Sequence, residues 1–109
     1  MDFADYQRLS RRTAVYPRAA APLTYPVLGL TGEAGEVAEH AKKMIRDDGG
    51  ELTEERREAM GKELGDVLWY LAQLASELDL DLDDIAQGNL DKLLSRQQRG
   101  VLSGSGDER

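Results

Sequence analysis

Apolar residues recur every three or four positions along this chain, and this spacing predicts helices. Phe3, Tyr6 and Leu9 lie on one face of a first helix that we expect over about 3–14, with Asp2 as its N-cap. No stretch alternates apolar and polar residues for long enough to indicate a strand. The pattern therefore predicts an all-α fold, with further helices expected over about 24–46, 53–78 and 82–98.

Prolines interrupt the pattern between the first two helices. Pro17, Pro22 and Pro26 make most of the segment 15–26 an irregular connection. Thr24 can cap the second helix, with Pro26 in its first turn, where a missing N–H group is tolerated. We expect walls of any binding pocket to include this connection.

The end of the chain differs in composition from the helical part. Thr53 opens the third helix after "RDDGGELT" has ended the second, and "GVLSGSGDER" follows the fourth. Residues 1–100 are expected to form a single domain and residues 101–109 a flexible Gly/Ser-rich tail. An elongated helical domain in a chain of 109 residues exposes much of its surface, so we expect oligomerisation to complete its core.

Composition removes several classes of function. A net charge of −7 argues against a nucleic acid polymer as the main partner, but is compatible with binding cations. The absence of cysteine excludes disulfides, thiolate zinc sites and cysteine nucleophiles. The longest apolar run is far below the roughly 18 residues that suggest a membrane span, and the N-terminal segment does not resemble a signal peptide. We therefore expect a cytoplasmic protein that does not bind membranes.

A short acidic pattern occurs twice. "EAGEV" (33–37) and "ELGDV" (63–67) both fit Glu-x-Gly-(Glu/Asp)-Val. On helices with 100° per residue, the first acid of each copy borders the apolar face and the second lies roughly 60° further out. A single such pair is usually a solvated helix face, but a repeat in the same register on two helices favours a shared site.

The two apolar faces predict how these acids meet. If the faces pack in an antiparallel pair, the carboxylates converge at one rim of the interface, where a cation would keep them ionised. Ligation by oxygen alone suits Mg²⁺, Mn²⁺ or Ca²⁺. The sequence has no Glu-x-x-His, which argues against a ferritin-like di-iron site. The residues that form the two faces are Leu30, Ala34, Val37, Ala41, Met44 and Ile45, and Met60, Leu64, Val67, Leu71, Leu74 and Leu78.

"LTGEAGEVAEHAKK" followed by "KELGDVLWYLAQLA" resembles the all-α nucleoside triphosphate pyrophosphohydrolases, which include the MazG-like proteins and their dCTPase and dimeric dUTPase relatives. The resemblance covers about 3–100 and is strongest over 28–75. It implies a four-helix MazG-like bundle, and it places metal ligands at Glu33, Glu36, Glu63 and Asp66. MazG itself has a further Glu where this chain has Gly32, as in the shorter dCTPase-like branch.

The resemblance also implies an activity and partners. The expected reaction is Mg²⁺-dependent cleavage of a nucleoside or deoxynucleoside triphosphate to its monophosphate and pyrophosphate, with Mn²⁺ as a possible substitute. Either Glu36 or Glu63 would help to deprotonate the attacking water, which makes both candidate catalytic residues. Nucleotide-pool house-cleaning is the expected role, in a dimer or tetramer.

Candidate substrate contacts lie on three helices. The resemblance places a substrate-contacting tyrosine at Tyr70, whose alternative role is a boundary-layer aromatic. Lys43 is a candidate phosphate ligand by its position on the second helix. Asn89, Lys92 and Arg96 share a face that suits phosphate recognition, although an exposed basic helix end is an equal alternative.

Other residues near these positions have open roles. Trp69 is expected to stack on a base or to contact another subunit. Gln7 and Arg11, on the first helix, are candidates to contact the nucleotide from a neighbouring subunit. His40 lies near the acids of the second helix, although a lone polar residue on a helix is more often incidental. Gly29 could leave room for substrate.

Two alternatives to the enzyme remain. A non-catalytic helical interaction module with the same fold would be favoured if one of the four acids were missing, but all four are present. A metal-binding or di-metal redox protein is disfavoured by the absence of Glu-x-x-His. The sequence leaves the preferred base and sugar open.

Overall fold

The computed structural model describes residues 1–18 and 21–109, and Ala19 and Ala20 of the predicted connection lie outside the described residues. Within the described part of the chain the secondary structure is helical, with no strand, so the all-α prediction is confirmed. Its four helices are α1 (Phe3–Arg11), α2 (Thr24–Asp47), α3 (Glu54–Glu77) and α4 (Leu82–Gln98).

Caps explain most helix boundaries. The Asp2 carboxylate accepts a hydrogen bond from the Asp5 N–H group at 2.8 Å, and the Thr53 hydroxyl accepts one from the Arg56 N–H group at 3.1 Å. Helix α1 ends at Arg11, three residues before the predicted end. The Thr13 hydroxyl donates to the Ser10 carbonyl at 2.7 Å, and this competition with the helical hydrogen bonds ends α1 in a turn.

The predicted cap of α2 is wrong. Thr24 is the first residue of the helix, and Leu23 occupies the N-cap position without a side-chain hydrogen bond. The Thr24 N–H group donates to the Ala21 carbonyl at 3.0 Å, so a preceding turn leads directly into the helix and no hydroxyl cap is needed. Pro26 lies in the first turn, as predicted, and is buried.

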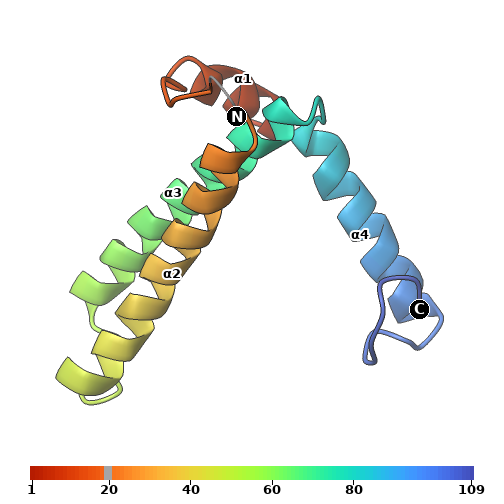
Figure 1. Ribbon diagram of the computed structural model, residues 1–109. Coiled ribbons are helices and arrows are strands. Elements are labelled where there is room, and N and C mark those ends of the chain that lie inside the picture. The colour runs from red at the N-terminus through yellow and green to blue at the C-terminus, as the bar shows by residue number, and fades with distance from the viewer. Residues whose placement is uncertain (19–20) are drawn as a thin grey trace.

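Helices α2 and α3 form an antiparallel hairpin, and α1 lies across its open end (Figure 1). At the closed end, Gly49 and Gly50 adopt φ values of 66° and 80°, which favour glycine. At the open end, helix α4 leaves the junction of α1 and α3 in another direction and contacts α1 rather than packing along the hairpin. None of the described helices combines the length and apolar character needed to cross a membrane.

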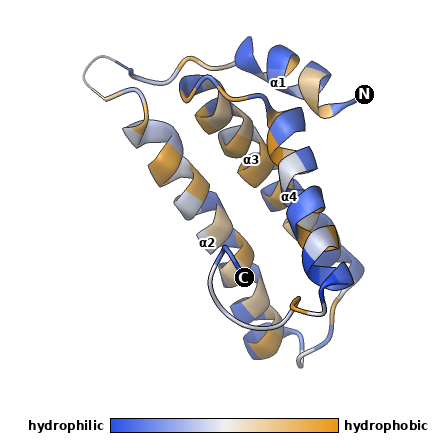
Figure 2. Cartoon of the chain, turned by 90° about the vertical axis from the view of Figure 1, so that its right-hand side faces the viewer, coloured by the Kyte–Doolittle hydropathy of each residue, from blue (hydrophilic) through white to orange (hydrophobic). Residues whose placement is uncertain are grey.

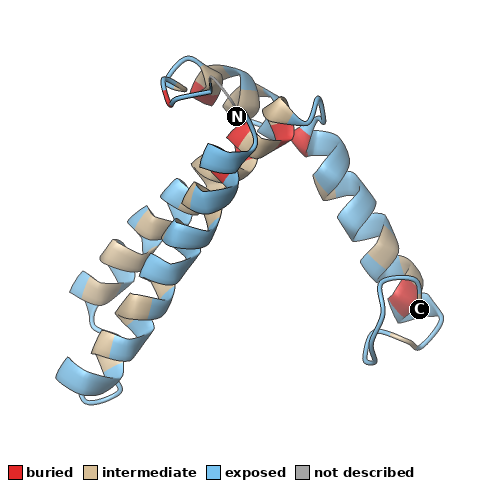
Figure 3. Cartoon of the chain, viewed as in Figure 1, coloured by how far each residue is buried: buried red, intermediate tan, exposed pale blue. Residues whose placement is uncertain are grey.

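The core is small and lies where α1 meets the end of α3 (Figure 3). Its buried hydrophobic residues are Tyr16, Ala72, Ala75 and Leu82. Large apolar side chains along the hairpin and α4 stay exposed, and Figure 2 shows hydrophobic positions recurring along α2 and α3. Leu28 is 66% and Ile45 71% exposed, with Leu64, Leu90, Leu93 and Leu94 also exposed. These exposed side chains favour the predicted self-association, which stays a prediction.

A polar network holds the junction together. The Glu77 carboxylate accepts hydrogen bonds from the Tyr16 hydroxyl at 2.6 Å and from Arg18 Nε at 2.7 Å, and Arg11 pairs with it at 3.3 Å. These donors, Arg18 first, lower the pKa of Glu77 to about 2. Fully buried Gln73 accepts from Arg11 at 3.2 Å, which ties α1 to α3.

The segment after α4 folds back on that helix. Lys92 Nζ lies 2.7 Å and Arg96 NH2 3.3 Å from the Asp107 carboxylate. Arg109 donates to the Val101 carbonyl at 3.1 Å. The predicted flexibility of residues 101–109 stays a prediction.

Candidate metal centre

The hairpin brings three of the four predicted acids together. Glu33 of α2 and Glu63 and Asp66 of α3 each offer one carboxylate oxygen, and these oxygens all lie within 4.8 Å of one another. Glu33 and Glu63 are half-buried, and Asp66 is exposed. The two helices therefore supply a compact acidic group, although Glu33 is at least 30 residues from the other two acids in the sequence.

The acidic group is electrostatically unfavourable for the protein alone. Burial raises the pKa of Glu33, and the charge of Asp66 and a hydrogen bond with Glu63 raise it further. A cation among these oxygens would relieve the repulsion. Ligand oxygens around an octahedral Mg²⁺ lie about 3 to 4.2 Å apart, because each is about 2.1 Å from the ion. The donor set and its spacing therefore fit a hard divalent cation after a small contraction.

Glu36 does not join this group. Its side chain is exposed, one turn along α2 from Glu33, and the group within 4.8 Å contains only the other three acids among the described residues. The predicted 60° offset does not explain this difference, because Asp66 has the same offset on α3 and joins the group. The charge of Glu36 still contributes to the raised pKa of Glu33, so it lies close enough to influence the group.

Tyr70 lies beside the acids, as predicted. A pocket of about 370 Å³ is lined by Glu33, Asp66, Trp69, Tyr70 and Thr13. Burial raises the pKa of Tyr70, and the charges of Tyr25, Glu33 and Asp66 add to this effect. The acidic group therefore opens onto a wall with two aromatic side chains.

That wall continues into the proline-rich connection. Tyr16 and Tyr25 stack with ring centroids 5.2 Å apart, and Trp69 meets Tyr70 edge-to-face at 5.0 Å. The Trp69 indole N–H donates to the Thr13 hydroxyl at 2.8 Å. The sequence identified Trp69 and the connection as candidates for the pocket, but it did not identify Tyr16 and Tyr25, whose contacts depend on how the connection folds back.

Gly29 leaves room for Tyr70. A Cβ atom at Gly29 would overlap the Tyr70 ring, with Cδ1 only 2.5 Å away. The space expected for substrate at this glycine is therefore filled by the tyrosine that borders the acids. Tyr70 follows Glu63 by two helical turns, which places it opposite Gly29 and Glu33 in the antiparallel hairpin.

His40 faces the acidic group from the other side. Its Nε2 atom lies 3.5 Å from Glu63 Oε1, and its Nδ1 atom lies 3.2 Å from Arg56 NH1. From the sequence, His40 was expected to be incidental, although its position seven residues after Glu33 already placed both on one face. The sequence did not reveal the register between α2 and α3, which places His40 against Glu63.

The residues predicted to contact phosphate do not join the acidic group. Lys43 is half-buried on α2, and no ion pair joins it to the acids among the described residues. Asn89 is exposed on α4, which diverges from the hairpin (Figure 1). Lys92 and Arg96 pair with Asp107, which belongs to the segment that follows α4 and folds back on it. One chain does not bring these residues to its own acidic group.

Gln7 and Arg11 have structural partners within the chain, and their predicted contact with a nucleotide from a neighbouring subunit stays a prediction. Gln7 donates to the Ser76 hydroxyl at 3.1 Å and to the Leu80 carbonyl at 2.9 Å, and it accepts from the Leu82 N–H group at 2.8 Å. It thereby fixes the turn between α3 and α4. Arg11 is held by the Glu77 network described above.

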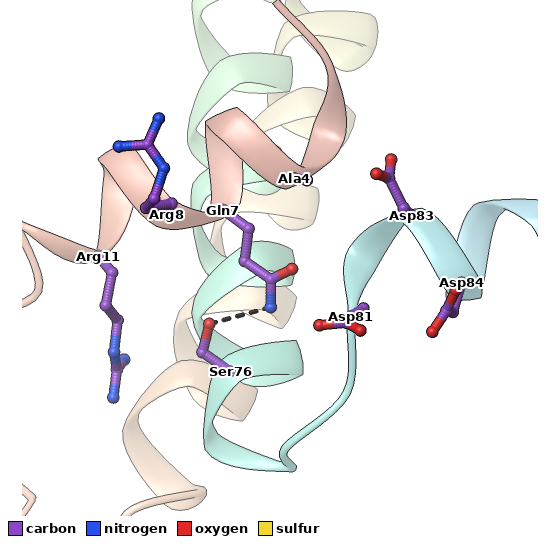
Figure 4. A pocket seen from close by; sticks show the side chains of 8 residues that line it. All are labelled: Ala4, Gln7, Arg8, Arg11, Ser76, Asp81, Asp83 and Asp84. Carbon is purple, nitrogen blue, oxygen red and sulfur yellow. Dashed lines mark hydrogen bonds between the residues drawn. The ribbon is translucent and has the colours of Figure 1, made fainter.

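A larger pocket, of about 530 Å³, lies between α1 and the start of α4 (Figure 4). Arg8 and Arg11 line one side, and Asp81, Asp83 and Asp84 line the other. The three converging acids are not among its lining residues. Its charged groups belong to the junction between helices rather than to the candidate metal centre.

Comparison with known proteins places these features in a family. The model of the MazG nucleotide pyrophosphohydrolase domain matches residues 24–101, which include both acidic motifs. The gene 37 protein of Mycobacterium phage L5 is similar, with 50% identity over 109 residues that cover 95% of this chain and 96% of the phage protein. No solved structure matches the chain.

Proposed function

Because this chain belongs to the family of the MazG nucleotide pyrophosphohydrolase domain, we propose that it hydrolyses nucleoside triphosphates to monophosphates and pyrophosphate. One observation carries the proposal: Glu33, Glu63 and Asp66 converge within the matched segment. Carboxylates gathered beside a half-buried seam suit a site that binds divalent cations together with substrate phosphates. Nucleotide-pool house-cleaning in the cytoplasm is the corresponding role.

The three converging acids would hold Mg²⁺, and Mn²⁺ could replace it. The cation would neutralise phosphate charge and orient a water molecule for in-line attack. Carboxylate ligands from both helices fix this position relative to the hairpin. Glu36, exposed beside the group, completes the predicted ligand set when substrate binds.

A carboxylate must also accept a proton from the attacking water. Glu36 and Glu63 are the candidates. Glu36 is exposed, and among the described residues no ion pair holds its carboxylate, so it can turn towards a water at the acidic group. Glu63 lies within the converging group and faces His40. Proton transfer by a positioned carboxylate contributes about 10²–10⁴-fold to such reactions.

The aromatic wall suits the nucleoside. Tyr70 and Trp69 line the same pocket as Glu33 and Asp66, so a base or sugar placed there would keep its phosphates near the acids. Aromatic rings offer a flat surface on which a base can stack, and the polar residues of the same pocket suit the rest of a nucleotide. Tyr70 would then contact substrate, with Lys43 further along α2 as a second candidate contact.

A second copy of the chain would supply the remaining phosphate contacts. Asn89, Lys92 and Arg96 lie on α4, away from the acids of their own chain. The exposed apolar residues of α4 and of the hairpin give a dimer or tetramer surfaces to bury. In such an assembly, the basic face of one copy could approach the acidic group of another.

The test is incubation with standard and modified nucleoside triphosphates and deoxynucleoside triphosphates in the presence of Mg²⁺ or Mn²⁺. We expect monophosphate and pyrophosphate in equal amounts, and no product with a chelator. Glu36→Gln should keep the fold and lose at least about 10²-fold in kcat. Glu39→Gln is the matched control, because Glu39 pairs with Lys42 on the same helix. Absence of turnover with every nucleotide would refute the proposal in favour of a non-catalytic helical module.

A further inference from the structure

A chain of polar contacts reaches the acidic group from the closed end of the hairpin. Asp48, which follows α2, accepts from Arg56 Nε at 3.0 Å. Arg56 NH1 lies 3.2 Å from His40 Nδ1, and His40 Nε2 lies 3.5 Å from Glu63 Oε1. We call these residues, Asp48, Arg56 and His40, the Asp48 chain. The family comparison assigns no role to them.

Every member of the Asp48 chain is well shielded from water. The side chains of Asp48, Arg56 and His40 are 17%, 18% and 18% exposed. By contrast, ion pairs such as Arg57 with Glu54 are 68% exposed on both sides. Shielded polar contacts hold their geometry better than solvated surface pairs, which contribute little.

The partners of His40 decide which of its ring nitrogens carries the proton. A guanidinium group has only donors, so a hydrogen bond from Arg56 requires an unprotonated Nδ1 atom. The neutral ring then carries its proton on Nε2, which faces the Glu63 carboxylate. The 3.5 Å separation is one that a small rotation of either side chain converts into a hydrogen bond.

We infer that His40, held by Arg56 and Asp48, is a positioning residue that orients the Glu63 carboxylate for metal binding. This inference rests on the proposed function. By engaging one oxygen of Glu63, His40 leaves the other for the cation and limits rotation of the carboxylate. Outer residues that orient metal ligands commonly change metal affinity by about 10–100-fold.

The first test uses the metal-free protein. His40 is the only histidine in the sequence, so ¹⁵N labelling of histidine gives an imidazole spectrum that needs no assignment. Above the range in which the ring is protonated, we expect one fixed form with the proton on Nε2. Arg56→Met should release this restriction and give a mixture of both tautomers. A mixture in the unaltered protein, or a proton fixed on Nδ1, would overturn the inference.

The second test measures Mn²⁺ affinity by electron paramagnetic resonance. His40→Leu removes the donor and should weaken Mn²⁺ binding by about tenfold or more, whereas His40→Gln retains an amide donor and should stay within about threefold of the original affinity. Lys42→Gln, two residues away and exposed, is the control. Unchanged affinity in His40→Leu, or no rescue by glutamine, would contradict the inference.

The two proposals fail in different ways. A fixed Nε2–H tautomer in a protein that hydrolyses no nucleotide would leave the positioning of Glu63 intact and refute the proposed function. Normal hydrolysis in His40→Leu with unchanged Mn²⁺ affinity would refute the positioning role alone. Circular dichroism of each variant checks that the helices remain folded.

Discussion

The contact between Gly29 and Tyr70 gives the sharpest stability prediction. In Gly29→Ala, the added methyl group would overlap the Tyr70 ring, so the ring or α2 must move. Overpacking of this kind costs about 1–3 kcal/mol, while replacing glycine by alanine inside a helix contributes about 1 kcal/mol of stability. We therefore expect the free energy of unfolding to fall by up to about 2 kcal/mol.

Gly32→Ala separates the two effects. Gly32 lies in the same helix, and a Cβ atom there would meet nothing within 4 Å. This variant should gain up to about 1 kcal/mol from helix propensity alone. The difference between the two variants, about 1–3 kcal/mol, isolates the overlap with Tyr70. It corresponds to a difference in Tm on the order of 4 °C per kcal/mol.

Urea unfolding of the metal-free protein, followed by circular dichroism, measures both free energies. In a Tyr70→Ala background the ring is gone, so Gly29→Ala and Gly32→Ala should stabilise the protein equally. Equal effects in the original background would refute the packing of Tyr70 against Gly29. Turnover should fall in Gly29→Ala, because the displaced ring lines the pocket with Glu33 and Asp66.

Three further predictions concern charge and assembly. Glu77 has a pKa lowered to about 2, so its contribution to stability is present above pH 4.5, near its ordinary pKa, and is lost as the pH falls towards 2. Glu77→Gln should therefore reduce the pH dependence of the free energy of unfolding in this range, as measured by urea unfolding. Burial and the charges of neighbouring acids raise the pKa of Glu33, so Glu33→Gln, which removes this half-buried charge, should raise the Tm of the metal-free protein while weakening Mn²⁺ binding in a titration; a lower Tm would contradict this. Gly35 has open space around it within one chain, so a shift of sedimentation towards monomer in Gly35→Ala is expected only if a second copy packs there.

Local patterns in the sequence predicted local structure well. Thr53 opens α3 and Leu82 begins α4 as expected, because caps and apolar spacing act within a few residues. The repeated acidic motif likewise predicted that Glu33 would meet Glu63 and Asp66. Register relative to an apolar face is a property of each helix alone, and hairpin pairing follows from the short connection between α2 and α3.

Features that depend on distant contacts were harder to predict. The end of α1 depends on a hydroxyl contact between Thr13 and Ser10, and the start of α2 on a turn rather than on a Thr24 cap. Periodicity did not predict the exclusion of Glu36 from the converging acids, because it places Glu36 and Asp66 at the same offset from their apolar faces. The direction of α4, which separates Lys92 and Arg96 from the acids, is not encoded in the spacing of its apolar residues.

Helix α4 is held at its first residues and extends away from the rest of the chain. Its 17 residues extend about 25 Å, while its base is held by buried Leu82 and by the hydrogen bonds of Gln7. A rotation of about 10° at that base would carry the far end through about 4 Å. Gln7 is thus placed to limit how far the basic residues near the end of α4 can move, since a small rotation at the base of the helix becomes a larger displacement at its far end.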